Sequence, residues 1–192
     1  MQTLMQKITE RSAHVSVIGL GYVGLPLALG FAQAGYQVTG IDTDPQKIAG
    51  IQAGLSHVQD VCSTALHQVV HSGRLRATSD FGVLAEVDSV SICVPTPLSK
   101  TKDPDISYIV AVTDAVRAHL HRGQLVVLES TTYPGTTDEV LLPRLASTGL
   151  QVGHDFYLNL FNKMGRNEDV SQEAPRLRTL ARSTMRSARD GI

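Results

Sequence analysis

Short apolar runs alternate with longer stretches of mixed polarity along most of the chain. The first run, residues 14–18, is rich in β-branched side chains and stops at a glycine, which is typical of a buried parallel strand. The Leu- and Ala-rich residues 22–34 predict a helix, with Pro26 tolerated in its first turn and Gly35 ending it. Residues 37–41 predict a second strand, so the chain opens with one βαβ unit.

The same alternation continues along the chain. Further helices are expected at 45–53, 61–72, 106–120 and 136–145, and further strands at 75–78, 89–94, 125–128 and 156–160. Strands that alternate with helices in this way predict a parallel arrangement. We therefore expect an α/β fold of the Rossmann type, a doubly wound and mostly parallel sheet with helices on both faces.

The alternating pattern ends near residue 161. Beyond it the chain is polar and has few apolar anchors, while five arginines crowd a short stretch: Arg176, Arg178, Arg182, Arg186 and Arg189. We interpret residues 161–192 as an irregular, Arg-rich tail without a domain of its own. A solvated or disordered appendage is favoured there over a binding patch.

A glycine-rich loop joins the first strand to the first helix. A dinucleotide pyrophosphate needs close approach to backbone N–H groups at a helix N-terminus. Gly19 would permit the tight turn, Gly21 would leave room for the phosphates, and Gly24 would let the helix pack closely on the sheet. Such triplets also occur in plain tight turns, but the strand before and the helix after favour a dinucleotide loop. The residues expected to contact the cofactor here are Gly19, Leu20, Gly21, Tyr22, Val23 and Gly24.

An acidic residue follows the second predicted strand. Asp42 lies 18 residues after Gly24, near the spacing of a carboxylate that hydrogen-bonds the adenosine ribose. Its charge would repel a 2′-phosphate, so we expect NAD rather than NADP, bound to a Rossmann domain over residues 14–160. The alternative role, capping the helix that begins at Pro45, suits Asp44 better. Lys47 would lie near the adenosine end, with a solvated surface lysine as the equal alternative.

Composition narrows the classes of partner. The 192 residues are 42% hydrophobic and 18% charged with a net charge of -1, which allows a sizeable core and gives no electrostatic reason to bind nucleic acid or an acidic membrane surface. No segment approaches the roughly 20 apolar residues of a membrane span, and residues 1–12 contain no apolar signal-peptide core. A cytoplasmic protein with neither nucleic acid nor membrane as partner is expected.

The cysteines and histidines predict neither a disulfide scaffold nor a metal site. Cys62 and Cys93 are 31 positions apart and are both expected to be small buried hydrophobes without an activating base nearby. Among seven histidines, only His67 and His71 stand at i and i+4 spacing, and that pair predicts a solvated helix face.

Three segments carry longer motifs in order. They are residues 17–28 (VIGLGYVGLPLA), 93–98 (CVPTPL) and 129–137 (ESTTYPGTT), and residues 104–109 (PDISYI) also fit. Together they resemble the UDP-glucose/GDP-mannose dehydrogenases over residues 14 to about 158, the NAD domain of a much longer enzyme. Within that family, residues 56–58 and 95–98 look most like the UDP-N-acetylglucosamine and UDP-N-acetylmannosamine 6-dehydrogenases.

The resemblance implies an activity and several roles. A UDP-sugar C6 alcohol would be oxidised to a carboxylate in two steps, with two NAD molecules and a cysteine thiohemiacetal, in polysaccharide biosynthesis. Ser130 would lie near the nicotinamide, and Thr131 would help to position a catalytic water. Capping of the helix near residue 136 is the alternative for both, although Thr136 and Thr137 are closer to it. Further cofactor contacts are expected at a strand end, in a loop that could also be merely proline-stiffened: Val94, Pro95 and Thr96.

The chain departs from the family pattern after residue 158. Lys163 stands where a Ser-Pro-Glu pattern should supply a glutamate, Glu168 lacks that motif, and the cysteine-bearing, sugar-binding half does not follow. We expect the NAD-binding portion of a nucleotide-sugar 6-dehydrogenase, with a UDP-sugar as substrate only if the missing half is supplied. The alternatives are a truncated or frame-disrupted product that binds NAD without turnover, or a fragment that associates with a full-length homologue. Loss of the covering half predicts self-association.

Overall fold

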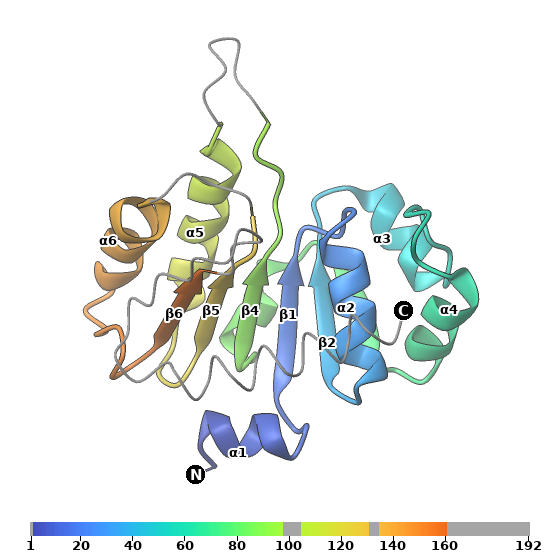
Figure 1. The fold of residues 1–192 in the computed structure, drawn as a ribbon, viewed down its shortest axis with the longest axis horizontal. Helices are drawn as coiled ribbons and strands as arrows, with labels where there is room; N and C mark the ends of the chain where they lie inside the picture. Colours follow the sequence, from blue (N-terminus) through green and yellow to red (C-terminus); the bar gives the residue numbers. More distant parts are fainter. Residues whose placement is uncertain (1, 98–104, 131–134, 161–192) are drawn as a thin grey trace.

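Six parallel strands form one sheet in the computed structural model, which describes residues 2–97, 105–130 and 135–160 (Figure 1). The strands are β1 (His14–Ile18), β2 (Gln37–Ile41), β3 (Leu75–Thr78), β4 (Ser89–Ile92), β5 (Leu125–Leu128) and β6 (Tyr157–Leu160). Their order is β3-β2-β1-β4-β5-β6, and each neighbouring pair is parallel. The direction of winding reverses between β1 and β4, so the predicted doubly wound Rossmann fold is confirmed.

The helices connect these strands in the predicted order. They are α1 (Leu4–Thr9), α2 (Gly24–Gln33), α3 (Pro45–Gln52), α4 (Ser63–His71), α5 (Ser107–His119) and α6 (Leu142–Ala146), with a 3-10 turn η1 (Phe81–Ala85) and a π-helical turn η2 (Thr137–Leu141). The single helix predicted over residues 136–145 is divided into η2 and α6. Within the described ranges, no helix is both long and apolar enough to cross a bilayer.

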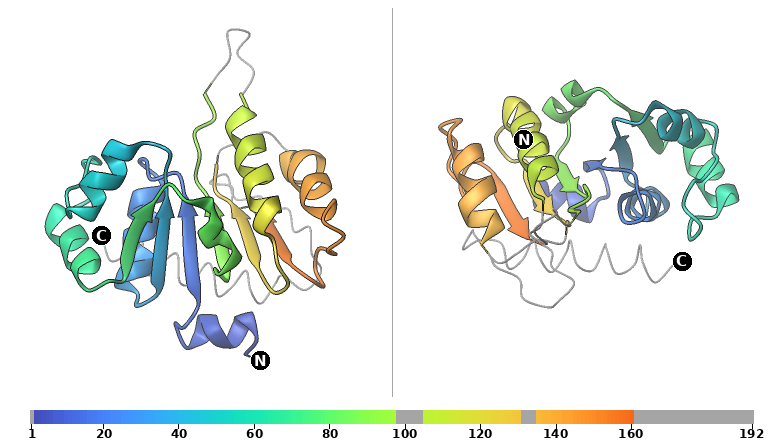
Figure 2. Two further views of the ribbon diagram at one scale, coloured as in Figure 1. Left: turned by 180° about the vertical axis from the view of Figure 1, so that it is seen from behind. Right: turned by 90° about the horizontal axis from the view of Figure 1, so that it is seen from above.

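Each face of the sheet carries its own apolar core. Successive side chains of a strand point to opposite faces, and so Val15 and Val17 pack with α2, α3 and α4, whereas Ile18 packs with the other cluster. That second cluster contains Ile92 of β4 and Ile109 of α5. Helices therefore cover both faces, and the view from above shows α2 and α5 on opposite sides of the sheet (Figure 2).

Two elements lie outside the sequence prediction. Helix α1 begins with a capping box between Thr3 and Gln6, buries Ile8, and lies below the amino ends of the strands (Figure 1). Lys7 Nζ joins it to the sheet, 2.5 Å from an Asp88 carboxylate oxygen. The other element is η1, just before β4. Elements this short carry too little hydrophobic periodicity to stand out in a sequence.

Candidate functional site

The predicted phosphate loop lies at the carboxyl edge of the sheet, where the strand order reverses. Gly19 continues from β1, and its N–H donates to the Ile41 carbonyl at 2.8 Å. Its φ of +90° lies in the left-handed region that glycine adopts without strain. A Cβ at this position would stand 2.7 Å from the Cys93 carbonyl oxygen, in the segment that follows β4. The loop therefore approaches the end of β4 as closely as backbone atoms allow.

The other two glycines of the loop have opposite surroundings. A Cβ on Gly24 would lie 1.8 Å from the Gly19 carbonyl oxygen, so the first turn of α2 packs directly on the loop. A Cβ on Gly21 would meet no atom within 4 Å. Tyr22 and Val23, 78% and 58% exposed, complete the rim. Because the first N–H groups of a helix have no intrahelical acceptor, this open rim suits an anion such as a phosphate.

Leu20 anchors the loop through three contacts. Its side chain is fully buried against β2, where a Cβ on Gly40 would stand 2.7 Å from a Leu20 methyl carbon. Its N–H donates to Oδ2 of Asp42 at 2.8 Å. Its carbonyl oxygen lies 2.8 Å from Nε2 of His57, in the segment between α3 and α4. The sequence pattern pointed to neither Gly40 nor His57 as a support of the loop.

Asp42 lies directly after β2 and is only 8% exposed. Oδ1 accepts the Asp44 N–H at 3.0 Å, and Oδ2 lies 3.4 Å from Nζ of Lys47. Burial alone would raise the pKa of Asp42, but the N–H groups of Asp44 and Leu20, with the Lys47 charge, hold it below its ordinary value. The carboxylate is ionised at neutral pH and still has lone pairs for a sugar hydroxyl.

The predicted capping role of Asp44 is confirmed. The Asp44 side chain accepts the Gln46 N–H at 2.9 Å and so caps α3, with Pro45 in the first turn. This leaves the Asp42 carboxylate to the loop and to the space in front of it.

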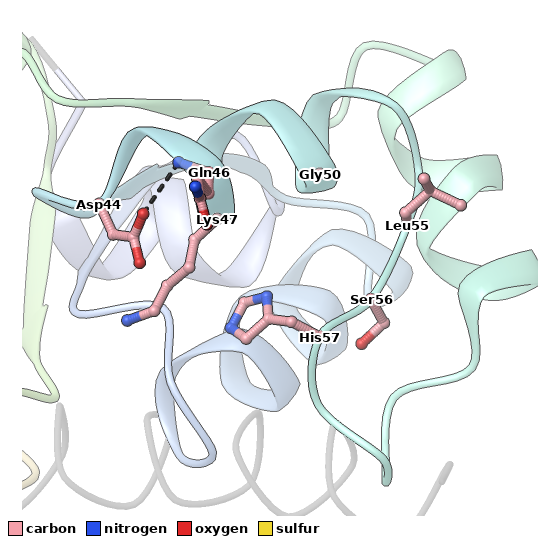
Figure 3. Close-up of a pocket in the computed structure, with 7 residues that line it drawn as sticks. All are labelled: Asp44, Gln46, Lys47, Gly50, Leu55, Ser56 and His57. Carbon is pink, nitrogen blue, oxygen red and sulfur yellow. Dashed lines mark hydrogen bonds between the residues drawn. The ribbon is translucent and has the colours of Figure 1, made fainter.

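A hollow of about 360 Å³ opens beside these aspartates, between α3 and the segment before α4 (Figure 3). The Lys47 side chain descends from α3 with its ammonium turned away from the His57 ring, and the 62% exposed Leu55 lies at the far end of the hollow (Figure 3). The lining combines a cation, an amide, hydroxyl and imidazole groups with apolar surface, which suits a flat heterocycle. Its residues are Asp44, Gln46, Lys47, Gly50, Leu55, Ser56 and His57.

Two further predicted segments meet at the ends of β4 and β5. The Ser130 hydroxyl donates to the Val94 carbonyl at 2.7 Å, so these two residues lie side by side. Pro95 is exposed and Thr96 half-buried. Thr131, the residue expected to position a catalytic water, lies outside the described residues, as does the tail over 161–192.

The two thiols differ, and one prediction about them is wrong. Cys93 is half-buried and packs against the core on the α2 side, and desolvation there, with a smaller contribution from the Glu129 charge, raises its pKa well above the ordinary value. Cys62 is exposed rather than buried. The helix predicted from residue 61 begins at Ser63, so Cys62 precedes the buried face and the N–H groups of Ala65 and Thr64 lower its pKa.

The histidine pair on α4 matches its prediction. His67 and His71 are exposed, with rings stacked at a centroid distance of 5.8 Å. Among the residues that the structure describes, there is no group of three or more His, Cys, Asp or Glu side chains that could hold a metal ion.

Comparisons with known proteins agree with this geometry. Residues 13–162 match the family model described as the UDP-glucose/GDP-mannose dehydrogenase family, NAD binding domain. The curated UDP-N-acetyl-D-mannosamine dehydrogenase of Pyrococcus horikoshii is 41% identical over 148 residues, which are 76% of this chain and 35% of the relative. The UDP-N-acetyl-D-glucosamine 6-dehydrogenase of Salmonella typhi is 36% identical over 75% of this chain and 33% of its own length. The chain thus spans about a third of the curated relatives that it matches.

Solved structures give the same result. The structure of the Pyrococcus horikoshii UDP-D-ManNAc dehydrogenase superposes with a TM-score of 0.79 at 34% identity, covering 91% of this chain and 44% of that one. A ternary complex of GDP-mannose dehydrogenase from Pseudomonas aeruginosa superposes with a TM-score of 0.80 at 29% identity, covering 88% and 44%.

Proposed function

The chain belongs to the UDP-glucose/GDP-mannose dehydrogenase family, whose NAD-binding domain it carries, and on that premise we propose that it is the cofactor-binding part of a UDP-sugar 6-dehydrogenase. The whole enzyme oxidises the C6 alcohol of a UDP-sugar to a carboxylate, in the cytoplasm and in the service of polysaccharide biosynthesis. The observation that carries the proposal is the ionised, nearly buried Asp42 held against an open glycine loop.

The described residues offer a place for each part of NAD. The N–H groups at the start of α2 bind the pyrophosphate above Gly21, where the structure leaves open space. Asp42 accepts hydrogen bonds from the adenosine ribose, Lys47 stands beside it, and the purine occupies the hollow. NAD supplies the hydride acceptor, and the nicotinamide lies toward residues 94–96 and Ser130, across the switch point.

Asp42 also selects between the two nicotinamide cofactors. A 2′-phosphate would meet an ionised carboxylate with little access to screening water, because Asp42 is only 8% exposed. NAD is therefore bound in preference to NADP.

Calorimetric titration of the 192-residue chain with NAD and NADP tests this function. We expect NAD to bind with a Kd below a millimolar. The Kd for NADP should be at least about tenfold higher. Asp42→Asn keeps one acceptor for the Leu20 N–H. In this variant the affinity for NAD should fall about tenfold, and the difference in affinity between NAD and NADP should become smaller. No heat with millimolar NAD would refute the proposal.

A second candidate, an NAD-binding module without turnover, is favoured by the state of the thiols. Within the described residues, Cys93 is half-buried with a raised pKa. Cys62 has a lowered pKa, but it lies at the start of α4, before the edge strand β3, and not at the switch point between β1 and β4, so neither thiol suits the nucleophile of this oxidation. Following NADH absorbance with UDP-sugars separates the candidates, because turnover by the chain alone excludes the module.

A further inference from the structure

We infer that His57 is a positioning residue that orients the Leu20–Gly21 peptide, so that the Gly21 N–H is presented to the pyrophosphate of NAD. This inference rests on the proposed function, since it assumes that NAD binds on the glycine loop. The observation behind it is the 2.8 Å contact between Nε2 of His57 and the Leu20 carbonyl oxygen, two residues 37 positions apart.

The direction of this hydrogen bond follows from its partners. A carbonyl oxygen only accepts, so Nε2 of His57 carries the proton and donates it. In a planar trans peptide, the C=O of one residue and the N–H of the next point to opposite sides. Among the described residues no peptide bond is cis. Holding the Leu20 carbonyl on the His57 side therefore turns the Gly21 N–H to the opposite side.

His57 is itself held in place by its neighbours. The Ser56 hydroxyl donates to the Val58 carbonyl at 2.8 Å and accepts the Val58 N–H at 3.1 Å. The Ser56 N–H donates to the Ser63 hydroxyl at 3.1 Å, which joins the segment to α4. Val58 is 2% exposed and packs in the core. A firmly bonded segment thus presents the imidazole to the loop, although the ring itself borders the hollow (Figure 3).

The other anchors of Leu20 make the contribution of His57 separable. The Leu20 side chain remains in its slot against Gly40, and its N–H remains bonded to Asp42, whatever stands at position 57. Without His57 the loop therefore keeps its place, while the Leu20–Gly21 peptide loses the bond that fixes its rotation. NAD binding then has to order that peptide, which costs conformational entropy. This cost lowers the affinity for NAD more than it lowers the free energy of unfolding.

Two substitutions of similar length test the inference in the 192-residue chain. His57→Gln keeps a side-chain N–H donor, and His57→Met removes it. We expect His57→Met to weaken NAD about fivefold, the factor for one lost hydrogen bond, and His57→Gln to stay within about twofold of the parent. The matched control is His71→Met, on the exposed end of α4, which should leave the affinity for NAD unchanged.

Shorter ligands separate positioning from direct contact. ADP, which carries the pyrophosphate, should show the same loss in His57→Met as NAD, whereas adenosine, followed by NMR titration, should show a clearly smaller loss, because methionine still fills the place of the ring at the edge of the hollow. An equal loss for adenosine would mean that His57 contacts the nucleoside in the hollow and would overturn the inference. The urea midpoint without ligand should stay close to that of the parent; a large fall that His57→Gln does not restore would point to a structural role instead.

A readout without NAD keeps this test distinct from that of the proposed function. The Gly21 amide signal in a ¹H–¹⁵N spectrum of the free chain should move in His57→Met and return toward the parental position in His57→Gln. An unmoved signal would overturn the inference. If the parent binds NAD but His57→Met binds it equally well, only this inference fails; if the parent binds no NAD, the proposed function fails with it.

Discussion

Gly21 and Gly24 stand three residues apart in one loop, and a methyl group added to each would have opposite consequences. At Gly24 the new carbon would overlap the Gly19 carbonyl oxygen, 1.8 Å away, and no flexible side chain can yield there. At Gly21 it would enter open space. The surroundings therefore fit the two roles that the motif predicts, room for a phosphate at Gly21 and close packing of α2 at Gly24.

The matched pair Gly24→Ala and Gly21→Ala checks this assignment. Gly24→Ala should lower the free energy of unfolding by about 1–3 kcal/mol, the cost of overpacking a tight contact. Gly21→Ala should change it by less than about 0.5 kcal/mol while weakening NAD binding measurably. Urea denaturation and calorimetry measure the two effects. Equal stability losses in both variants would contradict the assignment.

A second contact at the residue scale joins β2 to the loop. Gly40 lies within β2, where a Cβ would stand 2.7 Å from a methyl carbon of the fully buried Leu20. We expect Gly40→Ala to cost about 1–3 kcal/mol in the parent and much less in a Leu20→Ala background, because the clash partner is then absent. A double-mutant cycle from urea midpoints measures the coupling. Additive losses would show that the two residues do not compete for one space.

At the scale of elements, a polar chain crosses the sheet toward its amino edge. Nε of Arg76 in β3 donates to the Thr39 hydroxyl of β2 at 2.9 Å, and that oxygen lies 2.9 Å from Nε2 of His14 in β1. The His14 N–H donates to an Asp88 carboxylate oxygen at 2.9 Å, just before β4. Since Arg76 donates to the hydroxyl oxygen, the hydroxyl proton is free to go to a neutral His14 ring.

This chain of contacts predicts a pH dependence. Burial, then the Arg76 charge, lowers the pKa of His14 from 6.5, against smaller raising effects of Asp88 and Glu86. A lowered pKa means that the unfolded chain binds more protons below pH 6.5, so stability is full above that pH and declines as the pH falls toward the folded value. The pKa of the Asp42 carboxylate is lowered from 3.8, so its contribution to the free energy of unfolding is lost only as the pH falls below that value.

Urea midpoints of the parent and of His14→Gln, measured at roughly pH 7, 6 and 5, check this expectation. The difference in unfolding free energy between the two chains should shrink or reverse as the pH falls, because only the parent loses the contribution of a neutral His14. Taking the difference cancels the titration of the six other histidines. A difference that stays constant over this range would contradict the prediction.

At the scale of the whole molecule, the sheet formed by the described residues ends at β3 on one side and at β6 on the other. An edge strand offers its backbone for pairing with a second chain, and Tyr108 adds a half-exposed aromatic ring on α5. We therefore expect self-association that increases with concentration. Light scattering over a dilution series measures it, and a constant monomer mass at high concentration would contradict it.

The periodicity of the sequence was sufficient for the fold class, because strand and helix patterns are local. The predicted strands 14–18, 37–41, 75–78 and 125–128 are confirmed residue for residue, and those at 89–94 and 156–160 are only slightly shorter in the structure. Short or irregular elements were missed. Helix α1 and the turn η1 have too few residues to show a hydrophobic period, and the π-helical turn η2 interrupts the α-helical period expected over residues 136–145.

By itself, the sequence determined the glycine loop, the acidic residue after β2, the capping role of Asp44 and the class of cofactor. Each depends on residues close together in the chain, where spacing alone sets the geometry. Only the tertiary structure decided that His57 and Gly40 support Leu20, that Ser130 bonds to Val94, and that Cys62 is exposed. These contacts depend on the order of the strands and on where each helix begins. Hydrophobic periodicity specifies the kind of each element but not its neighbours in space.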